Sequence, residues 1–362
     1  MMKRYAIAMW DFSWIERRWP GAGYENWDMV LDELLERGYN AVRIDAFPHL
    51  VSVNKDKYWT LFPVWTLLDW GSPTKNIVQV QPALNQFISK CRSRDIKVAL
   101  STWYRQDQDN LRMNIETPVI MARQWIETIK SIEEDNLLDN ILFVDLCNEW
   151  PHPVWAPFFN NIPDGLGEEG WYTDASMKWM QEAAGVFKQA FPDLPVTFSF
   201  KSNHQLCEKD LSFLDLLEPH IWMAKSNNEE FYRETGYNYP SNNPVGFERM
   251  VDKAESLYLS RKEYWNKLLK DDIIETARIA KEKNLPLVTT ECWAVVDYKD
   301  WPLLNWEWVK ELCEFGVDIA IYSRAWMAIA TSNFCGPQFS GMWRDIEWHN
   351  RLTSKIKTSF LS

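Results

Sequence analysis

The sequence predicts a single (β/α)8 barrel that spans residues 1–362. Eight apolar, β-branched runs alternate with amphipathic runs of helical period, and no linker or low-complexity segment interrupts them. The strand-like runs are almost continuously hydrophobic, which is typical of parallel strands covered by helices. A doubly wound nucleotide-binding sheet is disfavoured, because "PGAG" at 20–23 lacks the GxGxxG spacing expected after its first strand.

The first half of the chain contains four expected strands, at 5–10, 40–47, 96–103 and 140–149. Helices are expected between them at 26–38, 81–94 and 117–135. Gly38 stands where a helix C′ glycine is common, and Thr117 with Pro118 has the pattern of an N-cap followed by a first-turn proline.

The second half contains four further expected strands, at 195–200, 217–223, 285–293 and 317–326. Amphipathic runs predict helices at 174–191, about 206–217, about 248–283, 305–316 and roughly 344–358. The connections after strands are long at about 47–78, 150–172, 223–247 and 327–343, whereas those after helices are short. Since barrel enzymes place their chemistry at the carboxyl ends of the strands, these long loops are expected to wall a site.

Charge and motif content exclude several kinds of partner. The formal net charge is -12 without a basic run, which disfavours nucleic acid and anionic membranes. The six cysteines form no CxxC pair, and no HxH, HExxH or carboxylate triad indicates a metal, so we expect no cofactor. No run of about 18 apolar residues suits a membrane span, and the apolar run after Arg4 is short for a signal peptide. We expect a cytoplasmic protein, or an extracellular or periplasmic one if a signal has been removed; the sequence does not indicate its oligomeric state.

The 22 tryptophans point to carbohydrate as the partner. Core filling accounts for many of them, but several lie in loop-like, proline-containing segments. An indole there offers a flat apolar face and one polar N–H, which suits the C–H faces of sugar rings.

Two carboxylates end apolar strands and are the candidate catalytic pair. Glu149 ends the fourth expected strand and Glu291 stands at the end of the seventh. Strands four and seven face each other across a barrel mouth, so the two carboxyls can lie ~5–5.5 Å apart, as in retaining glycosidases. Arg43 is expected to keep Glu291 ionised, while aromatic surroundings keep Glu149 protonated. Asp45 and Asp145 are expected to pair with Arg43 or with other polar groups inside the barrel.

These strand-end motifs resemble glycoside hydrolase clan A, especially the cellulase-like family 5 group. The matches are "NEWP" at 148–151, Arg43 in "VRI", His220 in "PHIW", Glu291 in "TTECW" and Trp326 on the eighth expected strand. They occur in barrel order over about residues 5–326. The chain departs from the family pattern at the third strand, which ends in "STWY" without a histidine, and at the sixth, where Trp222 replaces a tyrosine.

The resemblance implies a role for each matched residue. Glu149 would be the acid/base and Glu291 the nucleophile. Asn148 would hold the sugar 2-OH, His220 would lie beside both carboxylates, and Trp326 would form the floor of the −1 subsite.

Further aromatic residues at strand ends are candidate substrate contacts, namely Trp103, Tyr104, Trp222 and Trp293. Trp103, Tyr104 and Trp293 could equally pack the barrel mouth. The expected function is retaining hydrolysis of β-linked glycosides or short oligosaccharides, with exo action favoured by the long loops. A non-catalytic sugar-binding barrel and a transglycosidase are the alternatives, and the sequence does not indicate which sugar would occupy the −1 subsite.

Overall fold

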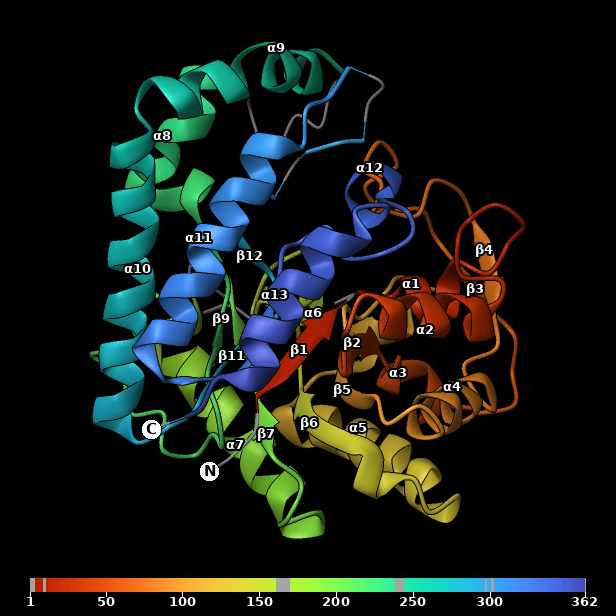
Figure 1. Ribbon diagram of the computed structural model, residues 1–362. Helices are drawn as coiled ribbons and strands as arrows, with labels where there is room; N and C mark the ends of the chain where they lie inside the picture. Colours follow the sequence, from red (N-terminus) through yellow and green to blue (C-terminus); the bar gives the residue numbers. More distant parts are fainter. Residues whose placement is uncertain are drawn as a thin grey trace.

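The computed structural model describes residues 4–8, 11–160, 170–237, 244–296, 298–300 and 303–361 (Figure 1). Within these ranges the parallel strands occupy eight positions around a barrel. Four positions are single strands in the first half of the chain: β1 (Tyr5–Ala8), β2 (Ala41–Asp45), β5 (Lys97–Ser101) and β6 (Ile141–Asp145). Three are split in two: β7 (Val196–Thr197) with β8 (Ser199–Phe200), β9 (Glu218–Pro219) with β10 (Ile221–Trp222), and β11 (Leu287–Thr289) with β12 (Cys292–Trp293). The eighth is β13 (Trp326–Ala330).

Strand pairing closes this ring and confirms the predicted (β/α)8 barrel. The continuous part is a seven-stranded sheet in the order β11-β13-β1-β2-β5-β6-β7. The remaining gap is spanned by the pairs β8–β9 and β10–β12 and by a parallel bridge between Leu217 and Leu287. The split strands bend where the chain passes from one pair to the next.

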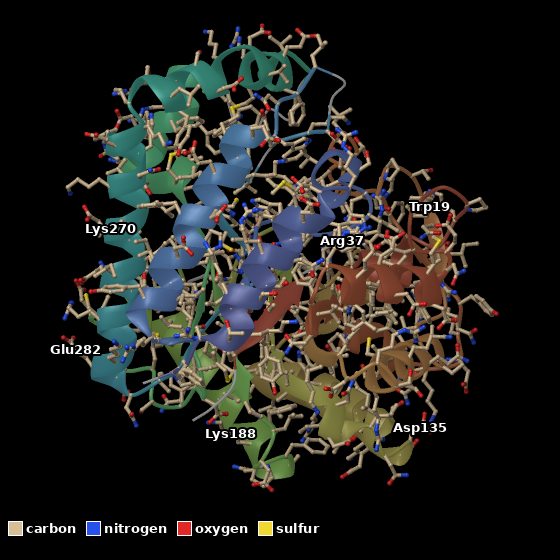
Figure 2. All side chains as sticks on the ribbon, in the orientation of Figure 1. Trp19, Arg37, Asp135, Lys188, Lys270 and Glu282 are labelled. Atoms are coloured by element: carbon tan, nitrogen blue, oxygen red, sulfur yellow. The ribbon has the colours of Figure 1, made fainter. Side chains whose placement is uncertain are left out.

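Amphipathic helices cover the outside of the barrel, as the hydrophobic period predicts. They are α2 (Trp27–Glu36), α4 (Ala83–Arg92), α5 (Pro118–Glu134), α7 (Asp174–Ala190), α10 (Lys262–Lys283), α11 (Glu307–Ser323) and α13 (Ile346–Thr358). In Figure 1, α10, α11 and α13 lie on one side of β1, and α4 and α5 lie on the other. Figure 2 shows that side chains fill the space between sheet and helices, while Lys270 and Glu282 lie on the outer side of α10.

Shorter elements occupy the long connections after the strands. The helices are α1 (Ser13–Glu16), α3 (Pro48–Val51), α6 (Pro157–Asn160), α8 (Ser226–Thr235), α9 (Pro244–Ser260) and α12 (Ser340–Trp343). An antiparallel hairpin joins β3 (Trp59–Leu61) to β4 (Asn76–Val78). The 3-10 turns are η1 (Leu111–Asn114), η2 (Leu138–Asn140), η3 (Gly170–Tyr172) and η4 (Met223–Lys225).

The predicted helix boundaries at Thr117 and Gly38 are confirmed. The Thr117 side chain accepts a hydrogen bond from the Ile120 amide at 3.3 Å, and Pro118 is the first residue of α5. Gly38 follows the end of α2 with a φ of +77°, where a Cβ would meet Thr353 Oγ1 at 2.4 Å. Only glycine fits this position without strain.

The prediction of a strand at 317–326 is wrong. Helix α11 continues to Ser323, and the eighth strand begins only at Trp326. The run is apolar enough to resemble a strand, but its buried residues recur with helical spacing at Leu312, Gly316 and Ala320. The loop after this strand therefore follows Ala330 instead of beginning at residue 327.

Two helix predictions are also corrected. Residues 206–217 form turns rather than a helix. The helix expected at 248–283 is two helices, α9 and α10, separated at Arg261. Residues 9–10 of the first expected strand, and residues 161–169 and 238–243 of two expected loops, lie outside the described residues. Among the helices that are described, none combines the length and apolar character needed to cross a bilayer.

Candidate active site

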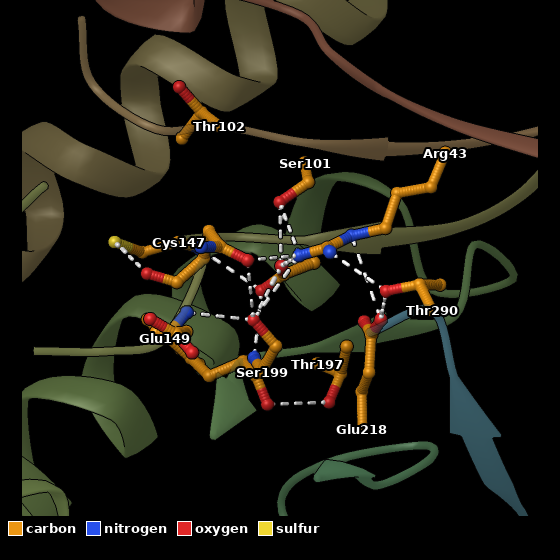
Figure 3. Close-up of polar contacts among 12 residues, drawn as sticks. Arg43, Ser101, Thr102, Cys147, Glu149, Thr197, Ser199, Glu218 and Thr290 are labelled. Carbon is orange, nitrogen blue, oxygen red and sulfur yellow. Dashed lines mark hydrogen bonds and ion pairs between the residues drawn. The ribbon is translucent and has the colours of Figure 1, made fainter. Parts of the chain in front are cut away.

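Arg43 lies at the centre of a polar network inside the barrel. Its side chain is fully buried and its Nη2 donates to Asp145 Oδ2 at 2.6 Å, Asn148 Oδ1 at 2.7 Å and Ser101 Oγ at 3.0 Å (Figure 3). A buried guanidinium requires such partners because its desolvation is costly. The predicted pairing with Asp145 is confirmed. Asp45 instead accepts hydrogen bonds from backbone amides, those of Phe47 at 2.7 Å and Trp103 at 3.0 Å.

The same guanidinium reaches the seventh strand position. Its Nη1 donates to Thr290 Oγ1 at 2.8 Å and lies 3.4 Å from Glu291 Oε1, while its Nε is 3.6 Å from Glu218 Oε1. Thr290 donates its hydroxyl hydrogen to Glu218. Burial alone lowers the pKa of Arg43, but the charges of Glu218, Asp145 and Glu291 raise it, so the guanidinium stays charged.

The turn after β6 places Asn148 and Glu149 at the barrel mouth. The Asn148 amide donates to the Thr102 carbonyl at 2.9 Å, and the Glu149 amide donates to Ser199 Oγ at 2.8 Å. These bonds to the neighbouring strand positions fix the backbone of both residues. Glu149 has a φ of +48°, in the left-handed region that non-glycine residues adopt at an energetic cost.

His220 joins the two predicted catalytic carboxylates. Its Nδ1 lies 3.0 Å from Glu149 Oε1 and 3.5 Å from Glu291 Oε2. One ring nitrogen of His220 and one carboxylate oxygen from each glutamate all lie within 4.8 Å of one another. The structure therefore brings together the two acids and the histidine that the sequence predicts to meet.

The pKa shifts of the two acids run opposite to the sequence-based expectation. Burial would raise the pKa of Glu149, but the hydrogen bond from His220 Nδ1–H lowers it below its usual range. A neutral imidazole can donate this hydrogen bond. Burial favours the neutral form, because it lowers the pKa of His220. Burial and the neighbouring Glu149 charge raise the pKa of Glu291 well above its usual range. The Arg43 guanidinium does not prevent this, because Asp145 and Glu218 share it.

These surroundings therefore favour Glu291 over Glu149 as the carrier of a proton that the pair shares. Two carboxylates at this separation repel each other when both are ionised. They therefore lose their protons in two successive steps, and the pKa of each step is a property of the pair rather than of one residue.

The donor atoms of Glu149, His220 and Glu291 could also surround a divalent cation. The Arg43 guanidinium, 3.4 Å from Glu291, disfavours a second positive charge there.

Two of the predicted aromatic residues lie next to this cluster. Trp103 is buried with its ring centroid 4.9 Å from the Arg43 guanidinium carbon. Trp222 meets His220 edge to face, with ring centroids 5.4 Å apart, and Lys225 Nζ lies 5.1 Å from the Trp222 ring centroid.

Three other predicted contacts lie elsewhere. The Trp293 indole points toward α11, donating to the Ala330 carbonyl at 2.9 Å and packing against Gly316. Trp326 pairs with Leu287 at the start of its strand, at the opposite end from the acids, and packs on Trp293. Its placement under a sugar rested on the wrong strand boundaries. Tyr104 is fully buried and donates to the Leu146 carbonyl at 3.2 Å, so it packs the mouth.

The sequence analysis did not single out Glu218 or Lys225. Glu218 precedes His220 by two residues, so strand alternation places both on one face, and this signal could have identified it. Lys225 lies in η4 beyond the strand, where sequence offers no such rule.

A pocket of about 630 Å³ opens beside His220. Its wall consists of residues that follow β6 and β8, of His220, β10 and the residues after it, and of Asp272 of α10. The candidate site thus combines a buried pair of acids with an adjoining cavity.

A parallel barrel with paired acids at its carboxyl end has the architecture of a carbohydrate-active protein. The profile of the family described as "Sugar-binding cellulase-like" matches residues 7–357, and the chain belongs to this cellulase-like family. It is 55% identical to a protein from Parabacteroides distasonis that is provisionally named as a glycoside hydrolase. That crystal structure matches with a TM-score of 0.98 over 100% of this chain and 96% of the other.

More remote structural matches are β-glucuronidases. The enzyme from Ruminococcus gnavus is 14% identical, with a TM-score of 0.47 over 90% of this chain and 43% of its own. A β-glucuronidase from an uncultured Clostridium species is 10% identical, with a TM-score of 0.43 over the same 90% and 43%. None of the curated proteins compared with the chain matches it.

Proposed function

We propose that this protein hydrolyses β-linked glycosides with retention of configuration, using Glu149 and Glu291 as the catalytic pair. The observation that carries this proposal is the approach of one oxygen from each carboxyl to within 4.8 Å. Retaining enzymes hold their two carboxyl groups ~5–5.5 Å apart, whereas inverting enzymes leave ~6.5–9.5 Å for a water molecule.

Glu291 is the proposed nucleophile, because Arg43 lies beside it and can stabilise its ionised form. Glu149 then protonates the leaving oxygen and later activates the water that releases the sugar. A bound glycoside offers its oxygen as a hydrogen-bond acceptor to Glu149. This contact favours the shared proton on Glu149 and leaves Glu291 ionised. That is the reverse of the arrangement favoured without a substrate. His220, in contact with both acids, holds them at the required separation.

Asn148 is the proposed partner of the sugar 2-OH. Its Oδ1 accepts from Arg43 at 2.7 Å, so the group that it can offer a sugar hydroxyl is its NH2 donor. Trp103, over Arg43, and Trp222, beside His220, are the proposed aromatic contacts to the sugar. We expect short oligosaccharides or aryl glycosides as substrates and exo action, since long segments follow several of the strand ends.

A panel of nitrophenyl glycosides tests the activity, and NMR of the first product anomer tests retention. A 2-fluoro glycoside with a good leaving group should then trap an ester on Glu291. Fluorine slows both steps, and the leaving group rescues only the first. Peptide mapping should find the added mass on the segment that contains "TTECW". Inverted product, or a label on Glu149, would contradict the assigned roles.

A sugar-binding protein without turnover is the second candidate. Burial and the Glu149 charge raise the pKa of Glu291, which favours this candidate because only an ionised carboxylate can attack a sugar. Calorimetry separates the two: sugars that bind while every glycoside in the panel survives would favour binding alone.

A further inference from the structure

The long connection after β2 contains a compact loop from Val64 to Ser72, called the bridging loop below. The Val64 amide donates to the Ser72 carbonyl at 3.0 Å, and the Ser72 amide donates back at 2.8 Å, so the two ends of the loop lie side by side. Inside it, Trp65 packs edge to face on Trp70, with ring centroids 4.4 Å apart. A Cβ at Gly71 would lie 2.1 Å from the Trp65 carbonyl oxygen, so only glycine fits there. The loop is therefore a closely packed unit rather than an open connection.

The base of the bridging loop is tied to segments that follow the first and third strand positions. Arg17, just after α1, donates from Nη1 to the Gly71 carbonyl at 2.5 Å. Arg105, which follows β5, donates to the carbonyl of Phe62 at 2.7 Å, two residues before the loop begins. The Arg105 guanidinium is itself fixed by a buried ion pair with Glu16 at 2.9 Å. Both neighbours of the second strand position therefore hold the loop in place.

The bridging loop also reaches the segment that follows Glu149. Trp65 meets Trp155 edge to face, with ring centroids 4.4 Å apart. The Trp155 ring packs beside His152, and the His152 amide donates to the Glu149 carbonyl at 2.7 Å. A short series of contacts thus leads from the loop to the backbone of one proposed catalytic acid.

The tip of the bridging loop contacts the segment that follows Glu291. Lys299 Nζ donates to the Leu67 carbonyl at 2.6 Å, and the Asp300 amide donates to Asp69 Oδ2 at 2.6 Å. Lys299 and Asp300 follow β12, the strand that begins directly after Glu291. The loop is thus bonded to the segments that follow both proposed catalytic acids.

These contacts place the bridging loop across one side of the barrel mouth. The loop starts after the second strand position and touches segments that follow the first, fourth and seventh. Because the carboxyl ends of all the strands share one rim, a short loop that touches these segments must lie over the rim between them, at positions one to three. The pocket beside His220 lies on the other side, since its lining comes from positions four, five and six and from α10.

We propose that the bridging loop ends the substrate cleft on its side of the mouth and so confines cleavage to the ends of glycan chains. The proposal rests on the proposed hydrolysis and identifies the part of the chain that determines its exo action. A glycan that passes through a cleft needs free space on both sides of the acids. Here the packed rings of Trp65, Trp70 and Trp155 occupy one side, and moving the loop aside would break the hydrogen bonds at its base and tip. The loop thus selects substrates by excluding longer arrangements.

Two variants open this side of the cleft. In the first, residues 65–71 are replaced by Asn-Gly, a two-residue turn that suits the antiparallel pair of Val64 and Ser72. In the second, Asp69→Ala is combined with Lys299→Met, which removes both side chains that bond the tip to the seventh position while the loop keeps its length. Urea denaturation measures whether each variant folds; if the shortened one does not, the double variant decides.

The substrate is a linear pentasaccharide of the sugar that the nitrophenyl panel identifies, labelled at its reducing end. Each linkage then gives a different labelled product, which mass spectrometry of early samples identifies. The wild type should give a single labelled product first, as expected for cleavage at a fixed distance from a chain end. The shortened variant should also cleave the other linkages, with their rates rising roughly tenfold or more because a steric block is removed. The double variant should change in the same direction, and Lys130→Met, on the exposed face of α5, is the control that should match the wild type.

Each outcome decides a different point. A folded shortened variant that still gives one product, or a wild type that cleaves several linkages, would overturn the barrier and leave hydrolysis intact. If the wild type cleaves no glycoside, the proposed hydrolysis fails. Calorimetry with the β-linked disaccharides and pentasaccharides of glucose, mannose and xylose then tests the loop alone. The shortened variant should bind a pentasaccharide more tightly than the wild type and its disaccharide equally, and unchanged or absent binding of all three pentasaccharides overturns this inference too.

Discussion

His220 Nδ1 lies 3.0 Å from Glu149 Oε1, and this contact makes Glu149 the more acidic member of the catalytic pair. The hydrogen bond stabilises the ionised carboxylate, whereas the contacts of Glu291 with described residues, Arg43 at 3.4 Å and His220 at 3.5 Å, are longer. The imidazole therefore lowers the pKa of Glu149, while burial and the Glu149 charge raise the pKa of Glu291.

Replacing His220 should move the acidic limb of the pH profile. Without its hydrogen bond the pKa of Glu149 rises, so the first ionisation of the pair occurs at higher pH. We expect the acidic limb of kcat/KM for His220→Ala to shift to higher pH, together with a lower maximum. His204→Ala, in the neighbouring pocket, is the matched control and should leave the limb in place. An unchanged limb in His220→Ala would remove the histidine from this role.

Glu218→Gln should move the alkaline limb in the other direction. Burial raises the pKa of Glu291, and so do the charges of Glu149 and Glu218. Without the Glu218 charge, Glu291 loses its proton at lower pH, so the alkaline limb should shift to lower pH. Because glutamine can still accept from Thr290, the position of Glu291 should be retained, and a fall in activity without a shift would argue against an electrostatic effect.

The same substitution should change how stability depends on pH. Burial raises the pKa of Glu218 from 4.5 to about 7. Between these values the folded state holds more protons than the unfolded state, so the wild type loses stability as the pH rises through this interval. Chemical denaturation should show Glu218→Gln gaining stability relative to the wild type from pH 4.5 to pH 7. A constant difference across this range would show that Glu218 keeps its ordinary pKa.

Glu149→Ala should lose rate according to the leaving group. Substrates with poor leaving groups need protonation and should lose most of their rate, whereas activated aryl glycosides should lose far less. Added azide should partly restore the variant and give a β-glycosyl azide, since no carboxylate repels the anion. Glu291→Ala should be inactive on both substrate types. Normal turnover by both variants would make this cluster structural.

Gly316→Ala should destabilise the barrel. A Cβ at Gly316 would lie 2.7 Å from Trp293 Cγ, so the helix and the indole would have to separate, at about 1–3 kcal/mol. Gly185→Ala is the matched control on α7, where a Cβ meets nothing within 4 Å, and should gain roughly 0.5–1 kcal/mol from helix propensity. Urea denaturation of both variants measures the difference, and equal stabilities would contradict the close packing at Trp293.

The sequence indicated the barrel and the acids, because both depend on local patterns. Polar residues at the ends of apolar strands must face the mouth, and this places Arg43, Glu149 and Glu291. The predicted position of the eighth strand is wrong because the apolar pattern of residues 317–323 suits a strand as well as a helix. The helix is favoured by its packing against Trp293, which the sequence pattern does not reveal. The pKa order depends on which donor reaches which acid, and sequence spacing carries no information about a contact such as His220–Glu149.

The left-handed backbone at Glu149 also bears on how this chain can change over evolutionary time. Glycine adopts a φ of +48° without penalty, and it would also remove one of two neighbouring buried acids. Glu149→Gly should therefore relieve the backbone strain and the repulsion between the two acids, while it also removes the hydrogen bond with His220. Under the proposed hydrolysis, the strained backbone of Glu149 is a cost in stability that selection for turnover would maintain.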